Sequence, residues 1–322
     1  MEIEEDYQSP VKVGISTCLL GVSVRYNGGH KHDRFLTDTL GQYVEYVPVC
    51  PEVECGLPVP RESMRLVGNP ESPRLVTTRT KIDQTERMVN WARTRVEELK
   101  KEDLCGFIFS SKSPSSGMER VKVYNENGNP NNRGVGIFAR IFMEHFPLIP
   151  VEEEGRLHDP VLRENFIARI FTLKQWREVI RKPKSVGNIV SYHTKNKLHI
   201  LSHSEVHYRE MGRLVAKGKM MPLKEFYKKY ETLLMKALKL KSTPSKNCNV
   251  LQHILGYFKK NLTPGEKQEL LDIILDYRNG FIPLIVPITL INHYVRKYEQ
   301  LYLKEQTYLN PHPMKLKLRN HV

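Results

Sequence analysis

Hydrophobic positions are arranged differently in the two halves of the chain. In the first half, short apolar runs rich in β-branched residues alternate with longer stretches whose apolar residues recur at helical spacing. The runs that predict strands are 12–18 (KVGISTC), 45–50 (EYVPVC), 106–111 (GFIFSS), 119–124 (ERVKVY) and 148–153 (LIPVEE). The stretches that predict helices are 34–43, 83–102 and 134–145. Strands that alternate with helices predict an α/β domain with a Rossmann-like parallel sheet.

The second half contains only helical patterns. The predicted helices are 160–181, 203–218, 222–240, 246–262, 264–279 and 285–303. The segment TPGEKQELLDIILDYRNG has Thr263 as its N-cap, Pro264 at the first helical position and Gly280 just past the end. We therefore predict an α/β domain over residues 1–157, followed by an all-α domain over residues 158–322.

Charge separates the same two halves. Residues 1–158 carry 20 Lys and Arg against 23 Asp and Glu, whereas residues 159–322 carry 30 against 13. All of the chain's net charge of +14 therefore comes from the second half, whose own net charge is +17. A compact domain with this charge attracts polyanions and speeds their encounter, which predicts nucleic-acid binding. The alternative is a solvated basic surface that only aids solubility.

Composition also narrows the cellular setting. No apolar run reaches the roughly 18 residues that a membrane span needs, and the acidic start MEIEEDYQSP lacks the apolar segment of a secretory signal. Five cysteines are an odd number in a long chain without such a signal. We therefore expect a cytoplasmic protein without a membrane partner, whose thiols serve a metal or catalysis instead of disulfides.

Three of the predicted strands are followed by loops that carry cysteine, glutamate or serine side chains: TCLLG, CPEVECG and SKSPSSG. Ligands of open parallel sheets bind outside the carboxyl ends of the strands, so these loops are expected to share one crevice. Thiolates of Cys18, Cys50 and Cys55 would suit a soft metal or an iron–sulfur cluster there. The alternatives are buried thiols without a ligand, which we favour for Cys105 and Cys248, and a zinc ion with a bound water.

Longer motifs add a resemblance to known families. CLLGVSVRYNGGHKHD, VCPEVECGLPVPRE and SPSSGMERVKVY resemble the TudS-type thiouracil desulfidases. HTKNKLHILSHSEVHYREMGRLVA, NVLQHILGYFKKNL, DYRNGFIPLIVPITLINHYVRKY and YLNPHP resemble the YbgA-type helical domain. The fusion of the two resembles the RudS-type tRNA 4-thiouridine desulfidases.

The resemblance implies a reaction and a cofactor. It implies hydrolytic conversion of 4-thiouridine in tRNA to uridine with release of hydrosulfide. It also implies a 4Fe–4S cluster that three cysteines bind and whose fourth iron is free to take the substrate's sulfur. No nucleotide cofactor is expected, because the sequence has neither G-x-G-x-x-G nor a P-loop.

This sequence departs from the family at one cluster ligand. The family commonly has its third cluster cysteine in SPSCG, whereas here the segment is SPSSG and Ser116 stands in that place. Serine is a poor ligand for a cluster built on thiolates. We predict that Cys55 replaces the missing ligand, so that Cys18, Cys50 and Cys55 hold the cluster.

Other residues of these motifs are candidates for catalysis and substrate binding. Glu52 lies between two predicted ligands and is the candidate general acid or base, while the resemblance gives Ser113 a hydrogen bond to the substrate or to the attacking water. Their alternative roles are a surface carboxylate and a turn residue. The candidates for substrate binding are Arg25, Tyr26, Gly28 and Ser116. A tight turn is the alternative reading of the glycine segment.

The predicted tRNA contacts lie in the basic half, where Lys and Arg would position phosphates. The candidates are Lys182, Lys184, Lys195, Lys197, Arg209, Arg213 and Lys217. A thiouridine buried in folded tRNA would have to be flipped out to react. The competing functions are desulfuration of free thiouracil or a thionucleoside, and a non-catalytic RNA-binding protein whose cluster senses oxygen or iron.

Overall fold

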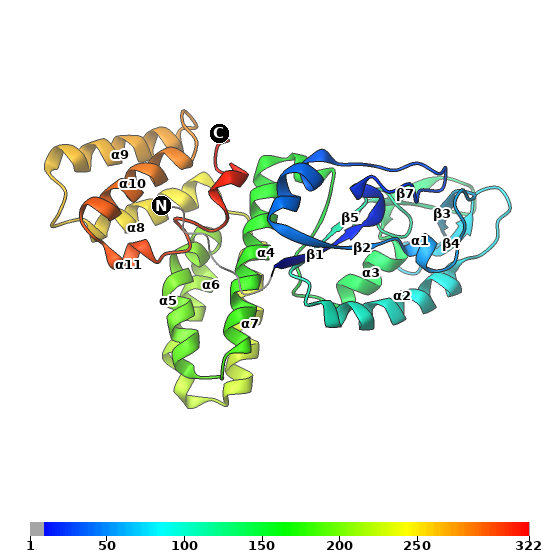
Figure 1. Cartoon of the computed structure of the whole chain (residues 1–322), viewed down its shortest axis with the longest axis horizontal. Helices are drawn as coiled ribbons and strands as arrows, with labels where there is room; N and C mark the ends of the chain where they lie inside the picture. The colour runs from blue at the N-terminus through cyan, green and yellow to red at the C-terminus, as the bar shows by residue number, and fades with distance from the viewer. Residues whose placement is uncertain (1–9, 322) are drawn as a thin grey trace. The chain divides into compact units, whose positions relative to one another are not determined.

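The structure, a computed structural model, describes residues 10–321, and the chain divides into two units after Asp159 (Figure 1). The acidic first nine residues, which were read as lacking a secretory signal, lie outside the described residues. Among the described residues, every helix is too short or too polar to span a bilayer.

The first unit is built on the parallel sheet that the sequence predicts. Its strands are β1 (Val11–Ser16), β2 (Val44–Val49), β5 (Gly106–Phe109) and β8 (Val151–Glu153), and they pair in the order β2-β1-β5-β8, all parallel. The helices α2 (Thr85–Leu99) and α3 (Ile137–His145) cover one face of it (Figure 1). Phe107 and Phe109 of β5 pack there against Phe138 and Phe142 of α3. The α/β prediction is confirmed.

A second sheet was not predicted. It consists of β3 (Met64–Val67), β4 (Arg74–Thr77), β6 (Val121–Tyr124) and β7 (Pro130–Gly134), paired in the order β4-β3-β6-β7. The run 119–124 was assigned to the parallel sheet, and that assignment is wrong. Its buried and exposed positions alternate, as in a strand with one solvated face, whereas all of β5 is buried.

The segment 34–43 is also not the regular helix that was expected. It forms a single π-helical turn, Phe35–Thr39, followed by a 3-10 turn, Leu40–Gln42. The buried carboxylate of Asp33 accepts a hydrogen bond from the backbone N–H of Leu36 and so starts the turn locally. Short side-chain capping of this kind competes with a continuous helix.

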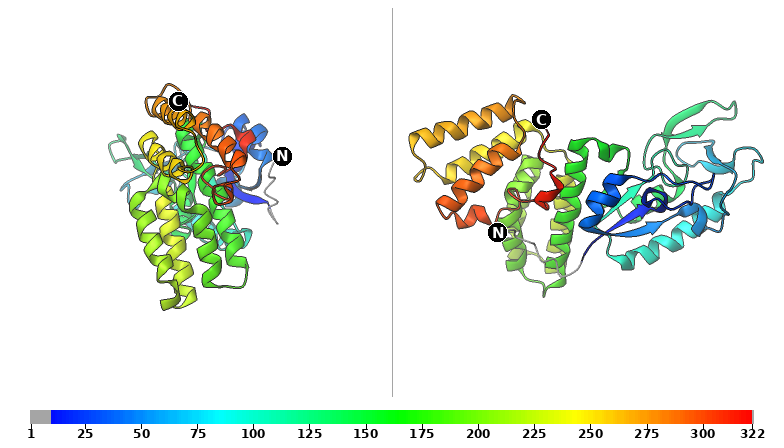
Figure 2. Two further views of the ribbon diagram at one scale, coloured as in Figure 1. Left: turned by 90° about the vertical axis from the view of Figure 1, so that its left-hand side faces the viewer. Right: turned by 45° about the horizontal axis from the view of Figure 1, so that its top comes forward.

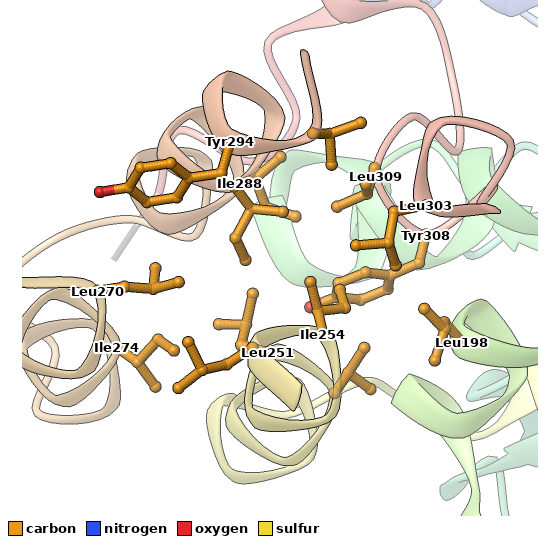
Figure 3. Close-up of a cluster of buried hydrophobic side chains, with 14 of the residues drawn as sticks. Leu198, Leu251, Ile254, Leu270, Ile274, Ile288, Tyr294, Leu303, Tyr308 and Leu309 are labelled. Atoms are coloured by element: carbon orange, nitrogen blue, oxygen red, sulfur yellow. The ribbon is translucent and has the colours of Figure 1, made fainter. Parts of the chain in front are cut away.

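The second unit is helical, as predicted. Its helices are α4 (Pro160–Arg181), α5 (Val186–His203), α6 (Glu205–Ala216), α7 (Leu223–Lys239), α8 (Pro244–Tyr257), α9 (Pro264–Arg278), α10 (Ile285–Lys297) and the short α11 (Leu301–Lys304). The predicted start of α9 is confirmed, because Thr263 and Glu266 form a reciprocal capping box. Figures 1 and 2 show α4 to α7 side by side, and a hydrophobic core joins α8 to α11 to the second half of α5 (Figure 3).

The helix α5 was missed. Its sequence contains a glycine, β-branched residues and several histidines, all weak helix formers. Its stability comes from the Ser185 N-cap, which accepts a hydrogen bond from Asn188, and from burial of residues such as Ile189 and Tyr192. Tertiary packing therefore overrides the local preference here.

Candidate active site

The carboxyl ends of β1, β2 and β5 open onto one pocket of about 360 Å³. Residues from the three loops that follow these strands line the pocket, including Cys18, Cys50, Glu52, Ser113 and Ser116. The shared crevice expected from strand order is therefore present.

The geometry that presents Cys50 comes from the sequence CPEVE. Pro51 starts the short helix α1 (Pro51–Glu54) at its first position, and Cys50 is the N-cap. The side chain of Glu54 accepts a hydrogen bond from the Cys50 N–H at 2.7 Å and pairs with Arg95 at 3.0 Å. These contacts fix the thiol at the end of β2.

Cys18 lies in the 3-10 turn after β1, and its carbonyl accepts a hydrogen bond from the Lys31 N–H at 2.9 Å. Burial raises the pKa of the Cys18 thiol, and burial together with the Glu52 charge raises the pKa of Cys50 to about 12. Cys50 Sγ donates to Glu52 Oε2 at 3.8 Å. Both thiols thus occupy the walls of the same pocket.

The third predicted cluster ligand lies elsewhere. Cys55 ends α1, packs against the core cluster of the second sheet and donates to the Glu52 carbonyl at 3.3 Å. It is not one of the described residues that line the pocket, whereas Ser116 is. Within residues 10–321, no group of three or more His, Cys, Asp and Glu side chains is placed to hold one metal ion.

A chain of hydroxyls connects the serine loop to Glu52. Ser115 Oγ donates to Glu52 Oε1 at 2.6 Å and lies 3.0 Å from Ser113 Oγ and 3.4 Å from Ser116 Oγ. Ser113 Oγ also accepts hydrogen bonds from the backbone N–H groups of Ser115 and Ser116. Ser115 is fully buried. Sequence analysis missed this residue, because the motif SPSSG does not show which serine faces the carboxylate.

Two glycines hold the serine loop against α3. The carbonyls of Pro114 and Ser115 accept hydrogen bonds from Ile137 and Ala139, which satisfies donors at the start of that helix. A Cβ on Gly136 would lie 2.5 Å from the Ser115 carbonyl carbon, and a Cβ on Gly117 would lie 2.8 Å from the backbone carbonyl oxygen of Ser113. Only glycine allows these approaches, so the hydroxyl chain stands on a fixed backbone.

The basic side chains that line the pocket fall into two groups: those bonded to other groups of the protein, and those without a carboxylate partner. Lys31 pairs with Glu154, and Arg61 Nη1 donates to the Val24 carbonyl at 3.0 Å. Arg25 and Lys112 also line the pocket, and within residues 10–321 neither forms an ion pair with a carboxylate. The pocket therefore keeps positive charge that its own carboxylates do not neutralise.

Only part of the predicted substrate-binding segment lies at the pocket. Arg25 and Tyr26 line the pocket, and Tyr26 is 45% exposed. Gly28, with φ of +76°, closes a turn by donating to the Arg25 carbonyl and is not among the described lining residues. Lys31 and Lys112 were missed, because nothing in their local sequence distinguishes them from surface lysines.

The predicted tRNA contacts follow one pair of helices. Lys182 and Lys184 precede α5, and α6 folds back along α5 (Figure 1). The others lie on this pair or at its end: Lys195 and Lys197 on α5, Arg209 and Arg213 on α6, and Lys217 at the end of α6. All but the half-buried Lys197 are exposed.

Comparison with known proteins identifies both halves. Residues 13–154 match a family model described as 2-thiouracil desulfurase, and residues 197–313 match one described as a protein of unknown function (DUF1722). The uncharacterized protein YbgA of Escherichia coli (strain K12) is 31% identical over 158 residues, which cover 49% of this chain and 94% of that protein. A solved structure of the 4Fe-4S-dependent thiouracil desulfidase TudS is 28% identical, with a TM-score of 0.40, and covers 48% of this chain and 99% of that chain.

The resemblance inferred from the sequence motifs is thus confirmed. The chain belongs to the YbgA family and joins that helical domain to an N-terminal domain matched by the 2-thiouracil desulfurase model.

Proposed function

We propose that this chain is an iron–sulfur desulfidase that converts 4-thiouridine in tRNA to uridine. The observation that carries the proposal is the pocket, in which the thiols of Cys18 and Cys50 lie beside a carboxylate fixed by a buried serine. The match of residues 13–154 to the 2-thiouracil desulfurase model supports the same chemistry.

The reaction exchanges the sulfur of a C=S group for the oxygen of water and yields uridine and hydrogen sulfide, with no net oxidation or reduction. In this proposal Glu52 accepts the proton of the attacking water. Its Oε1 is occupied by Ser115, while from residues 10–321 Oε2 has only contacts of 3.8 Å, to Cys50 Sγ and Arg61 Nη2. Oε2 is therefore the oxygen that is free to take the proton.

Ser113 and Tyr26 would orient the base. Ser113 Oγ accepts hydrogen bonds from two backbone N–H groups, which hold this hydroxyl in place at the pocket wall. Because Ser115 Oγ gives its proton to Glu52, the Ser113 proton points to Ser115 Oγ, 3.0 Å away, and would turn to a carbonyl of the pyrimidine or to the water when the base binds. Tyr26 offers a half-exposed ring for stacking.

The donor set fits a 4Fe–4S cluster at two positions and departs from it at the third. Cys18 and Cys50 would supply two thiolates, and the bound cluster would supply an iron atom that accepts sulfur. We propose Cys55 as the third ligand, which requires its thiol to leave the Glu52 carbonyl. Ser116, which lines the pocket, is the competing donor. A Cys55→Ser variant that keeps full iron content while Ser116→Ala loses it would decide for Ser116.

Charge favours tRNA over a free base. Thiouracil is uncharged and gains nothing from the unpaired cations Arg25 and Lys112 or from a helical domain of net charge +17. A phosphate-bearing substrate gains from both. Desulfuration of free thiouracil is the second candidate, favoured by the description of the matching family model. A tRNA substrate places the reaction in the cytoplasm.

The test is anaerobic purification with iron and sulfide analysis, followed by incubation with bulk bacterial tRNA while the thiouridine absorbance is recorded. About four irons per chain and loss of that absorbance support the proposal, and Glu52→Gln should slow the loss about 10²–10⁴-fold. Turnover of free 4-thiouracil with tRNA untouched would favour the second candidate. A cluster with neither activity would favour sensing.

A further inference from the structure

Lys197, Tyr302 and Tyr257 form a layered group on the helical unit. The rings of Tyr257 and Tyr302 stack with centroids 5.0 Å apart and planes 22° apart. The Lys197 ammonium lies 4.9 Å from the centroid of the Tyr302 ring. Tyr257 is 43% exposed, so the group ends in an open aromatic surface. None of these residues belongs to the desulfidase pocket.

The three residues come from separate elements that the core holds in place. Lys197 is on α5, Tyr257 ends α8, and Tyr302 is on α11. Their neighbours Leu198 and Leu303 point into the core (Figure 3). The backbone N–H of Thr307 donates to the Lys195 carbonyl at 3.0 Å and so ties the segment after α11 to α5. The aromatic surface is therefore preformed.

We propose that Tyr257, supported by Tyr302, is a stacking platform for an unpaired nucleobase of RNA, with Lys197 beside it for the adjoining phosphate. This inference rests on the proposed RNA substrate and adds the place where single-stranded RNA docks on the helical unit. Single-stranded RNA is bound by aromatic rings on which bases stack and by nearby cations that follow the backbone. A preformed ring adds affinity because little conformational entropy is lost on binding.

Structural packing alone explains Tyr302, which is half-buried against the core, but not the exposed ring of Tyr257. The Lys197 ammonium favours RNA over a protein partner, because an exposed apolar contact for another protein would not need an ammonium group at the stack. The predicted tRNA contacts Lys195 and Arg209 are exposed on the same helix pair. Lys195 lies two residues before Lys197 on α5, and its ammonium pairs with Glu305 just after α11 at 3.5 Å, so one predicted phosphate contact lies close to the helix that carries Tyr302.

The test measures binding of the full-length protein to a labelled oligouridine of about ten nucleotides and to an RNA duplex of the same length. Tyr257→Leu should weaken binding of the single strand about tenfold, the loss expected for one stacked base. Tyr257→Phe keeps the ring and should bind like wild type. Lys197→Gln should lower the slope of log affinity against log salt by about one, whereas Tyr257→Leu should leave that slope unchanged.

The matched control is Phe281→Leu, which removes an aromatic ring that is 74% exposed after α9. It should bind both RNAs like wild type. Circular dichroism of each variant checks that the helices are intact. The inference is overturned if Tyr257→Leu binds oligouridine with wild-type affinity, if it loses duplex binding equally, or if the full chain binds a protein at this surface and no RNA.

The same variants separate this inference from the proposed function. Turnover of a 4-thiouridine mononucleotide should be unchanged in Tyr257→Leu, because the ring does not line the catalytic pocket. Tyr257-dependent RNA binding without any desulfidase activity would refute the proposed function and leave the platform intact. Normal turnover of tRNA together with Tyr257-independent binding would do the reverse.

Discussion

The hydrogen bond from Ser115 to Glu52 gives a quantitative test of the proposed site. Its Oγ–Oε1 distance is 2.6 Å, which is typical of a hydroxyl bound to an ionised carboxylate. Ser115 is fully buried and the Glu52 side chain is 15% exposed, so bulk water does not replace the bond easily. A hydrogen bond to a charged group contributes about 1.5–3 kcal/mol. Since about 1.4 kcal/mol is tenfold in rate, Ser115→Ala should lower kcat/KM about 10–150-fold.

We expect Ser115 to be a positioning residue, because it contacts Glu52 and would affect the reaction through that carboxylate. In the Glu52→Gln background the carboxylate is gone, and Ser115→Ala should then cost no more than about threefold. The double-mutant cycle therefore predicts a coupling energy close to the whole effect of the serine. The assay is anaerobic single-turnover loss of thiouridine absorbance, with iron per chain measured in every variant. Ser63→Ala is the matched control, since Ser63 lines the same pocket but bonds to Thr78.

Two results would refute this reasoning. Additive effects of Ser115→Ala and Glu52→Gln would mean that the serine does not act through the carboxylate. A loss of activity in Ser115→Ala that follows a loss of iron would mean that the serine supports the loop or the cluster.

Three further perturbations test other parts of the structure. In a Cys55→Ser background, Ser116→Cys puts a thiol on the pocket wall and should restore the iron that is lost with Cys55 after anaerobic reconstitution; a Cys55→Ser variant that keeps its full iron content would contradict Cys55 as the third ligand. Arg25→Gln and Lys112→Gln should raise KM for a 4-thiouridine nucleotide and leave KM for free 4-thiouracil unchanged; equal changes for both substrates would contradict a phosphate role. Burial lowers the pKa of His193 and of His203 to about 4, below the roughly 6.5 of the unfolded chain. Their stabilisation is therefore complete above pH 6.5 and is lost as the pH falls toward 4, by about 1.4 kcal/mol per histidine at pH 5.5; a free energy of unfolding that is flat from pH 7 to 5 would contradict this.

The parallel sheet could be predicted because its signal is local. Strands such as β5 are continuously apolar, and each ends at a loop whose residues are chemically distinctive. Strand order then brings the loops together without further information. The second sheet has short strands with half-exposed faces, and β7 contains hardly any apolar residues. Its pairing depends on partners far apart in the sequence, which periodicity does not reveal.

Prediction of the site from the sequence is limited in the same way, because it does not give the orientation of individual side chains. Sequence could bring Cys18 and Cys50 to one pocket, because both follow parallel strands. It could not orient Cys55, whose direction depends on where a single turn of helix ends. Nor could it choose among the serines of SPSSG, because the choice of Ser115 depends on how closely Gly136 lets the loop approach α3. Topology sets which loops meet, whereas side-chain orientation depends on tertiary contacts.

The charge distribution separates affinity from chemistry in this chain. Residues 1–158 have a net charge of −3, so the surface around the pocket gives little long-range attraction for RNA. Under the proposed function, the helical half, at +17, would provide that attraction, but cations that contact phosphates do not distinguish one nucleotide from another. Under the proposed function, selection of the thiolated base would then occur in the pocket, where backbone N–H groups hold Ser113 and a hydroxyl holds Glu52 beside the thiols. An RNA would be captured by charge and stacking on the helices, and the base would be chosen by its sulfur in the pocket.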